Sequence, residues 1–144
     1  MGLFPRLFSK PDPEERRRLE RAVADVDREL AANLELTSMF DQTKQAVVLE
    51  NGEFTRHGAT IRAGLAAAHG PLADLYSRLP DTESAMERRG PANSLRDADR
   101  TLIETWEGDA RAAQRGLREA LAAPRVLPFG ALLKRLRALL PSRR

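Results

Sequence analysis

Residues 12–40 read DPEERRRLERAVADVDRELAANLELTSMF, and this stretch decides the fold. Asp12 can cap the first amides of a helix, Pro13 suits the first helical position, and the acids at 14 and 15 favour the positive end of the helix dipole. Large apolar residues then recur, mostly at steps of three and four, at Leu19, Val23, Val26, Leu30, Leu34 and Phe40. This spacing predicts a helix with one apolar stripe over about 12–46, roughly 50 Å long.

A second apolar stripe predicts a helix over about 58–79. Its members are Ile61, Leu65, Ala68, Leu72, Leu75, Tyr76 and Leu79. Gly70 and Pro71 interrupt the pattern, since proline lacks a backbone donor and crowds the previous turn. The stripe continues beyond them, so we expect a kink at this point rather than a break. Pro80 is expected to stop the helix, and 80–93 to form a polar connection.

Residues 45–56 are open to two interpretations. Short apolar runs flank Asn51 and Gly52, a dipeptide suited to the tight turn of a β-hairpin because both residues tolerate positive φ. The other interpretation is a helix that ends at an Asn/Gly cap. The cap is favoured, because an isolated hairpin is marginally stable and no third strand is visible.

A third long helix is predicted over about 94–122, where Ser94 and Asp97 have the spacing of a capping box. Its stripe comprises Leu95, Leu102, Ile103, Trp106, Ala110, Ala113, Leu117, Ala120 and Leu121. A short helix is predicted over about 129–140. The fold class is therefore all-α: an elongated antiparallel bundle of three long helices plus a short C-terminal amphipathic helix, which can bring both chain ends together.

The formal charge is distributed unevenly along the chain. The net charge of +3 combines +2 over 1–18, −5 over 19–124 and +6 over 125–144. We accordingly divide the chain into a basic and apolar arm (1–11), a helical bundle (12–124), and a basic amphipathic helix with its tail (125–144). Such asymmetry is typical of a terminal arm that meets an anionic surface, or of a terminus docked on its own acidic body.

The C-terminal helix has an apolar face flanked by cations. An arc of about 120° contains Phe129, Leu132, Leu133, Leu136, Leu139 and Leu140. Lys134 lies opposite this arc, and Arg135 and Arg137 flank it. This pattern suits a helix in a lipid headgroup layer, and the N-terminal Phe4, Leu7 and Phe8 offer a second contact of the same kind. The competing interpretation, a leucine face that closes the bundle, is the commoner role of short terminal helices.

The chain has few residues suited to catalysis or metal binding. The absence of cysteine excludes disulfides, thiolate catalysis and cysteine metal sites, and two histidines exclude a histidine-rich metal site. His57 has Glu50 and Glu53 near it in sequence, the residue types of a general base. We interpret it instead as a solvated loop residue, because no nucleophile or third ligand accompanies it. His69 is expected to bond a backbone carbonyl freed by Pro71.

Two polar residues, Asn33 and Asp99, project toward apolar stripes. Burying either without a partner costs about 1–3 kcal/mol. We interpret Asn33 as setting helix register, and Asp99, about one turn into its helix, as reaching solvent. Gly108 is interpreted as a packing notch near Trp106, with a small-molecule pocket walled by Trp106 as the lesser alternative.

These patterns predict a non-catalytic helical interaction or adaptor protein, without cofactor or metal, that contacts an anionic membrane surface or an acidic protein partner. We expect it in the cytoplasm, because the longest uncharged run, 63–73, is too short to span a bilayer and Arg6 interrupts the only apolar stretch that could serve as a secretory signal. Its basic amphipathic C-terminal helix would place it at the inner face of the membrane. Two alternatives remain open. One is nonspecific nucleic-acid binding through the basic ends, which the acidic body disfavours; the other is a structural homo-oligomer whose stripes pair between chains.

Overall fold

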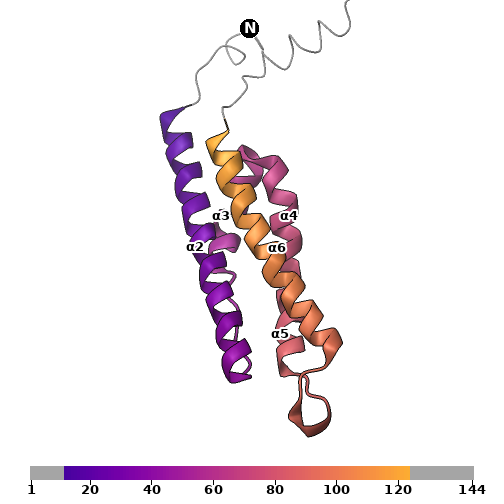
Figure 1. The fold of residues 1–144 in the computed structure, drawn as a ribbon. Helices are drawn as coiled ribbons and strands as arrows, with labels where there is room; N and C mark the ends of the chain where they lie inside the picture. Colours follow the sequence, from indigo (N-terminus) through magenta and orange to yellow (C-terminus); the bar gives the residue numbers. More distant parts are fainter. Residues whose placement is uncertain (1–11, 124–144) are drawn as a thin grey trace, which may run out of the picture.

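The computed structural model describes residues 12–123, and the regular secondary structure of this range is entirely helical. The elements are α2 (Pro13–Thr43), α3 (Gly52–Gly64), α4 (Ala66–Ser77), α5 (Leu79–Glu87), the 3-10 turn η1 (Pro91–Asn93) and α6 (Asp97–Ala122). Two long helices, α2 and α6, lie beside the shorter α3, α4 and α5 (Figure 1). The prediction of an all-α fold is confirmed for the described part of the chain.

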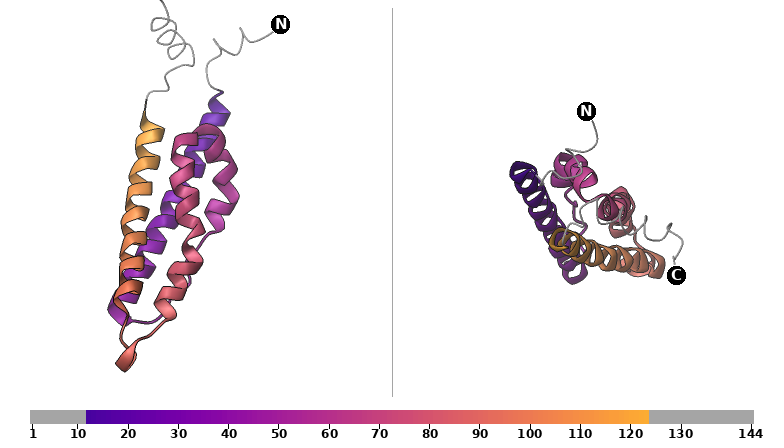
Figure 2. Two further views of the ribbon diagram at one scale, coloured as in Figure 1. Left: turned by 90° about the vertical axis from the view of Figure 1, so that its right-hand side faces the viewer. Right: turned by 90° about the horizontal axis from the view of Figure 1, so that it is seen from above.

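Four helices pack around one core. Helix α2 contacts α3 and α6, and α4 contacts the same two helices. The view along the bundle in Figure 2 shows this arrangement, with α5 continuing the line of α4. The predicted single middle helix over 58–79 is wrong, because three consecutive helices occupy that part of the bundle.

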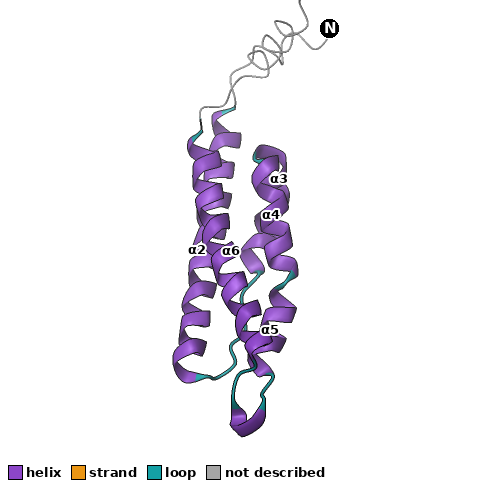
Figure 3. Cartoon of the chain, turned by 45° about the vertical axis from the view of Figure 1, so that its right-hand side comes forward, coloured by secondary structure: helices purple, strands orange, loops and turns teal. Residues whose placement is uncertain are grey.

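Helix α2 begins where its sequence predicts and ends earlier. The Asp12 carboxylate accepts a hydrogen bond from the Glu14 amide at 3.0 Å. At the other end Lys44 adopts a left-handed conformation with φ 59°, and its amide donates to the Phe40 carbonyl at 2.7 Å. This cap ends the helix at Thr43, and the link over 44–51 is a loop (Figure 3).

Both interpretations of residues 45–56 are wrong. Within 12–123 there is no strand, and Asn51 stands before the first residue of α3 instead of ending a helix. Helix α3 starts at Gly52, six residues before the predicted start at 58. The reason is a cap supplied by Glu29 of α2, a contact across 24 residues that a local pattern does not reveal.

The middle of the chain breaks at Leu65, and the kink predicted at Gly70 and Pro71 is replaced by a continuous helix α4 that contains Pro71. Leu65 has φ −137° and ψ 59°, outside the helical region. Just before it, a Cβ atom on Gly64 would lie 2.8 Å from Leu19 Cδ1, so a larger residue here would require the Leu19 side chain to move. The chain therefore breaks beside a close contact of α3 with α2, and not at the proline.

Residues 80–93 contain a helix where a polar connection was predicted. Pro80 is the second residue of α5, a position that needs no amide donor, so it begins this helix. Thr82, Ala85 and Met86 are buried by it. Ser94, predicted to cap the next helix, donates its hydroxyl to the Pro91 carbonyl at 2.7 Å, and α6 begins three residues later at Asp97.

The first and the last described residues lie at the same end of the bundle. Arg16 Nη2 donates to the Leu121 carbonyl at 2.8 Å, and farther along the same interface Arg118 pairs with Asp27 at 2.9 Å. Figures 1 and 2 show the first turn of α2 and the last turn of α6 at the same end, with the two helices antiparallel. We call this end, formed by residues 13–16 and 121–123, the terminal pole.

Candidate functional site

Glu29 is a buried carboxylate on α2 that bonds two other helices. Its Oε2 accepts from the Glu53 amide at 2.7 Å, and its Oε1 accepts from the Phe54 amide at 3.1 Å and from the Tyr76 hydroxyl at 2.8 Å. Asn51 makes no side-chain cap bond, so the first turn of α3 is capped from a different helix. The charge of Glu29 also complements the positive end of the α3 dipole.

An aromatic stack covers this carboxylate. Phe54 stacks on Tyr76 with ring centroids 4.3 Å apart, and His69 lies 6.0 Å from Phe54. Burial and then the Glu29 hydrogen bond raise the pKa of Tyr76, which keeps its hydroxyl protonated as a donor. The hydrogen bond predicted from the His69 ring to a backbone carbonyl is absent from residues 12–123. Its ring packs against Phe54 instead.

A histidine and two carboxylates meet between α2 and α3; we call Asp25, Glu53 and His57 the histidine cluster. His57 Nε2 lies 2.9 Å from Asp25 Oδ2 and 3.4 Å from Glu53 Oε2. The interpretation of His57 as a solvated loop residue is wrong, because it lies within α3 and its side chain is only 15% exposed. Glu50, the other carboxylate near it in sequence, is exposed.

The two carboxylates of the histidine cluster differ in their partners. Burial of Asp25 favours its neutral form, but hydrogen bonds from Arg28 and His57 outweigh burial and lower the pKa of Asp25. Glu53 Oε2 is buried and makes no hydrogen bond within the described structure. The basic side chains nearest to it are His57, at 3.4 Å, and the exposed Arg56, whose Nη1 lies 3.7 Å away. The cluster therefore holds one carboxylate with two hydrogen-bond partners and one whose buried oxygen accepts no hydrogen bond.

Sequence reasoning missed Asp25 and Glu29. One signal was available, because Glu29 lies three residues after Val26 and four before Asn33, which places it at the edge of the apolar stripe of α2. Asp25 carries no comparable signal, since its partner His57 is 32 residues away.

Asn33 is fully buried and anchors the link between α2 and α3. Its Nδ2 donates to the Glu50 carbonyl at 2.8 Å, and its Oδ1 accepts from the Glu50 amide at 2.7 Å. One side chain thus satisfies both backbone groups of Glu50. The partner of Asn33 is this loop rather than a facing helix, so its role differs from the helix register that we predicted.

Asp99 is buried, and the expectation that it reaches solvent is wrong. It is 6% exposed, and its Oδ1 accepts from Arg88 Nε at 3.0 Å and from Arg88 Nη2 at 2.8 Å. These hydrogen bonds outweigh burial and lower the pKa of Asp99. The pair joins the end of α5 to the first turn of α6.

We expect the Asp99→Asn variant to be less stable than the native protein near neutral pH, and the difference to shrink as the pH falls below about 4. A carboxyl group whose pKa is lowered by folding stabilises the protein above its unfolded pKa, and this contribution is lost as the pH falls through the folded pKa. Urea denaturation across this pH range measures the effect. Asp97→Asn, at an exposed position in the same turn, is the control. A stability difference that does not change with pH would contradict the assignment.

Thr37 and Glu107 form a second buried polar contact, between α2 and α6. Thr37 Oγ1 lies 2.9 Å from the Leu34 carbonyl and 3.2 Å from Glu107 Oε2. Burial and the charge of Asp41 raise the pKa of Glu107. Because a hydroxyl has one hydrogen, protonated Glu107 can donate to Thr37 while Thr37 donates to Leu34. The contact is a structural link.

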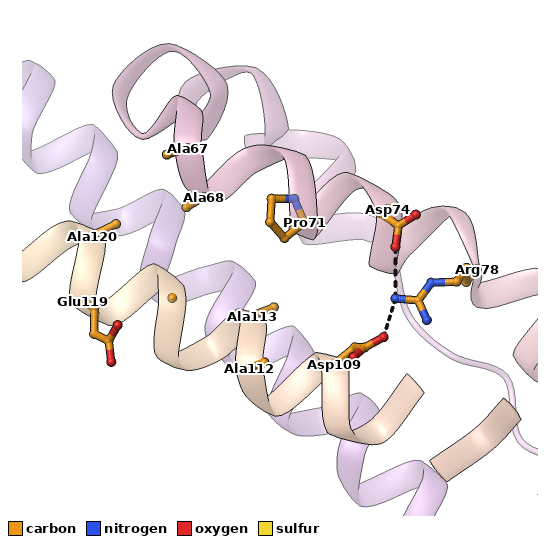
Figure 4. A pocket seen from close by; sticks show the side chains of 11 residues that line it. Ala67, Ala68, Pro71, Asp74, Arg78, Asp109, Ala112, Ala113, Glu119 and Ala120 are labelled. Atoms are coloured by element: carbon orange, nitrogen blue, oxygen red, sulfur yellow. Dashed lines mark hydrogen bonds and ion pairs between the residues drawn. The ribbon is translucent and has the colours of Figure 1, made fainter. Parts of the chain in front are cut away.

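A groove of 660 Å³ lies between α4 and α6 (Figure 4). Most of its lining is small, namely Ala67, Ala68, Pro71, Ala112, Ala113, Gly116 and Ala120. At one end Arg78 Nη2 lies 3.1 Å from Asp74 and 2.9 Å from Asp109, so these charges are already paired. Glu119 is the remaining charged residue of the lining, and Arg78 Nε is buried without a hydrogen-bond partner.

The predictions around Trp106 and Gly108 are wrong. Trp106 does not line the groove, since it is buried in the core and its Nε1 donates to the Leu75 carbonyl at 3.1 Å. A Cβ atom on Gly108 would have no neighbour within 4 Å, so this glycine is no packing notch.

The residues predicted to contact a membrane or partner lie outside the described residues. They are Phe4, Leu7, Phe8, Phe129, Leu132, Leu133, Lys134, Arg135, Leu136, Arg137, Leu139 and Leu140. Among residues 12–123, no helix has both the length and the apolar character needed to cross a bilayer.

Comparison with known proteins yields no relative for this chain. No protein-family model, no curated protein and no solved structure matches it.

Proposed function

We propose that this protein is a non-catalytic adaptor that binds an anionic membrane surface through its two basic ends. The observation that carries the proposal is the hydrogen bond from Arg16 to the Leu121 carbonyl, 2.8 Å long. It joins the first turn of α2 to the last turn of α6. Residues 1–11 and 124–144 therefore both connect to the bundle at the terminal pole, and two linked weak contacts bind more tightly than either alone.

The charge distribution favours one orientation on such a surface. Residues 12–123 contain 16 basic and 21 acidic residues, a formal charge of −5, whereas the two ends carry eight basic residues and no acid. An anionic surface attracts basic residues by about 1 kcal/mol each and repels the acidic bundle. The terminal pole is therefore the end of the bundle that faces the lipid.

The described bundle has few exposed large apolar side chains against which the C-terminal leucines could pack. In the described part of the chain the exposed large apolar side chains are Met39 and Val48. Met39 lies near the far end of α2 and Val48 in the loop after it, away from the terminal pole. The pole itself thus offers no exposed large apolar side chain for the Phe129 and leucine arc to cover, and lipid can bury that arc.

Co-sedimentation with vesicles tests the proposal. We expect the full-length protein to bind vesicles that contain phosphatidylserine, to leave purely zwitterionic vesicles unbound, and to dissociate as salt is raised. Deletion of 126–144 should abolish binding. The double variant Arg135→Glu/Arg137→Glu should weaken it strongly, whereas Arg100→Glu/Arg115→Glu, the same charge change at exposed positions of α6, should have little effect. Circular dichroism of each variant checks that it is folded.

Other outcomes point to the alternative functions. Equal binding by the two double variants, or no dependence on anionic lipid, contradicts the membrane proposal. Binding to mixed-sequence DNA with a steep salt dependence, in the absence of lipid binding, indicates a nucleic-acid function. A solution mass that is a multiple of 16.0 kDa, unaffected by the charge changes, indicates a structural oligomer. Unfolding on deletion of 126–144 indicates that the C-terminal helix belongs to the core.

A further inference from the structure

We infer that the histidine cluster of Asp25, Glu53 and His57 binds a divalent transition-metal ion of the Zn²⁺ type and thereby joins α2 to α3. The cluster offers one imidazole nitrogen and two carboxylate oxygens, all within 4.8 Å of one another. This nitrogen and oxygen set suits Zn²⁺ and similar ions, and three protein ligands leave a fourth position for water. Two carboxylates with a neutral imidazole also balance the charge of a divalent cation.

The two distances from His57 to the carboxylates are close to those of a tetrahedral site, and the two carboxylate oxygens lie within 4.8 Å of each other. Ligand atoms bound at about 2.0–2.1 Å to a tetrahedral ion lie about 3.3 Å from one another. His57 Nε2 and Glu53 Oε2 are 3.4 Å apart, so this pair already has the required separation. His57 Nε2 and Asp25 Oδ2 are 2.9 Å apart and need to separate by a few tenths of an ångström. His57 and Asp25 therefore need only a small side-chain adjustment.

An independent observation, the unpartnered oxygen of Glu53, also points to a cation. Glu53 Oε2 is buried and has no hydrogen-bond partner, although native structures satisfy nearly all such atoms. This oxygen lies 3.4 Å from His57 Nε2, the proposed nitrogen ligand. Arg56 is 70% exposed and its Nη1 lies 3.7 Å from this oxygen, so it can turn into solvent when an ion binds.

The backbone around the cluster holds its ligands in place. Glu53 and His57 are four residues apart on α3, so they lie on one face of the helix. The Glu53 amide is fixed by Glu29, and Glu29 is itself four residues after Asp25 on α2. One face of α2 thus both caps α3 and supplies the third ligand. The side chains of the cluster are 15–31% exposed, which leaves a path for an ion from solvent.

Calorimetric titration of the metal-free full-length protein with Zn²⁺ tests the inference. We expect one equivalent of Zn²⁺ to bind and to raise the Tm. Glu53→Gln should weaken binding by about 10-fold or more. This variant should fold, because the side chain of Glu53 accepts no hydrogen bond. Glu50→Gln removes the same charge three residues away at an exposed position, and it should bind Zn²⁺ as the native protein does.

Spectroscopy of bound Co²⁺ provides a second readout. Co²⁺ in place of Zn²⁺ should show the visible absorption of a four-coordinate site, and this signal should be lost in His57→Gln. The inference is overturned if the native protein binds no Zn²⁺, or if Glu53→Gln and Glu50→Gln bind it equally well. These experiments measure metal binding alone, so their result is independent of the proposed membrane binding.

Discussion

Replacing Glu29 with alanine should lower the free energy of unfolding by about 3 kcal/mol or more. The substitution removes the acceptor for three donors, namely the amides of Glu53 and Phe54 and the hydroxyl of Tyr76. Each buried donor left without a partner costs about 1–3 kcal/mol. Urea denaturation measures the change, and amide hydrogen exchange at residues 53 and 54 should accelerate by more than the global loss of stability predicts.

Two further variants separate capping from a general effect of charge. Glu35→Ala removes the same charge from an exposed position of α2 and should change stability little. Glu29→Gln keeps an acceptor oxygen and should lie between the native protein and Glu29→Ala. If Glu29→Ala is as stable as Glu35→Ala, the cap does not hold α3 and its early start at Gly52 has another cause.

The long helices α2 and α6 could be predicted from the sequence, but α5 and the breaks between the middle helices could not. Local signals at Asp12 and Pro13 fix the start of α2, since capping and proline preference act within one turn. The start of α3 at Gly52 is capped by Glu29, and the helix ends beside the contact of Gly64 with Leu19. These contacts join residues 24 and 45 positions apart, so no periodicity within a single segment contains them.

In the candidate site, too, the sequence indicates which polar residues face the core, but not which residues they contact. Helical spacing places Asn33 and Asp99 on the buried faces of their helices, and both are buried. It does not identify their partners, a loop backbone for Asn33 and Arg88 for Asp99. The histidine cluster was missed because the proximity of His57 to Asp25 arises only when α3 packs against α2.

The α2–α3 interface contains both the Glu29 cap of α3 and the proposed metal site. Asp25, Glu29 and Asn33 follow one another at four-residue steps, so they form a polar ridge along α2. The ridge meets His57, the first turn of α3 and the Glu50 backbone in that order. Each contact stabilises a different part of residues 50–57. This segment therefore depends on polar contacts with α2 as well as on apolar packing.

Asn33→Ala should cost about 2–4 kcal/mol, because it leaves both backbone groups of Glu50 without partners. Leu49 is buried immediately before Glu50, so loosening the loop also exposes an apolar side chain. Urea denaturation and hydrogen exchange of the Glu50 amide measure the two effects. Gln42→Ala, which removes an exposed amide side chain from α2, is the matched control and should change neither.

The Asn33→Asp variant tests how much the hydrogen bond donated by Asn33 Nδ2 contributes to stability. Asn33→Asp keeps an oxygen that can accept from the Glu50 amide, but it places a second oxygen where Nδ2 donated to the Glu50 carbonyl. The ionised carboxylate is then buried against a carbonyl oxygen, so near neutral pH Asn33→Asp should be at least as destabilised as Asn33→Ala. Protonation restores a donor, so the aspartate variant should regain stability at acidic pH relative to the alanine variant. If both variants match the native protein in stability and in exchange at Glu50, the loop is held by Leu49 and its apolar neighbours alone.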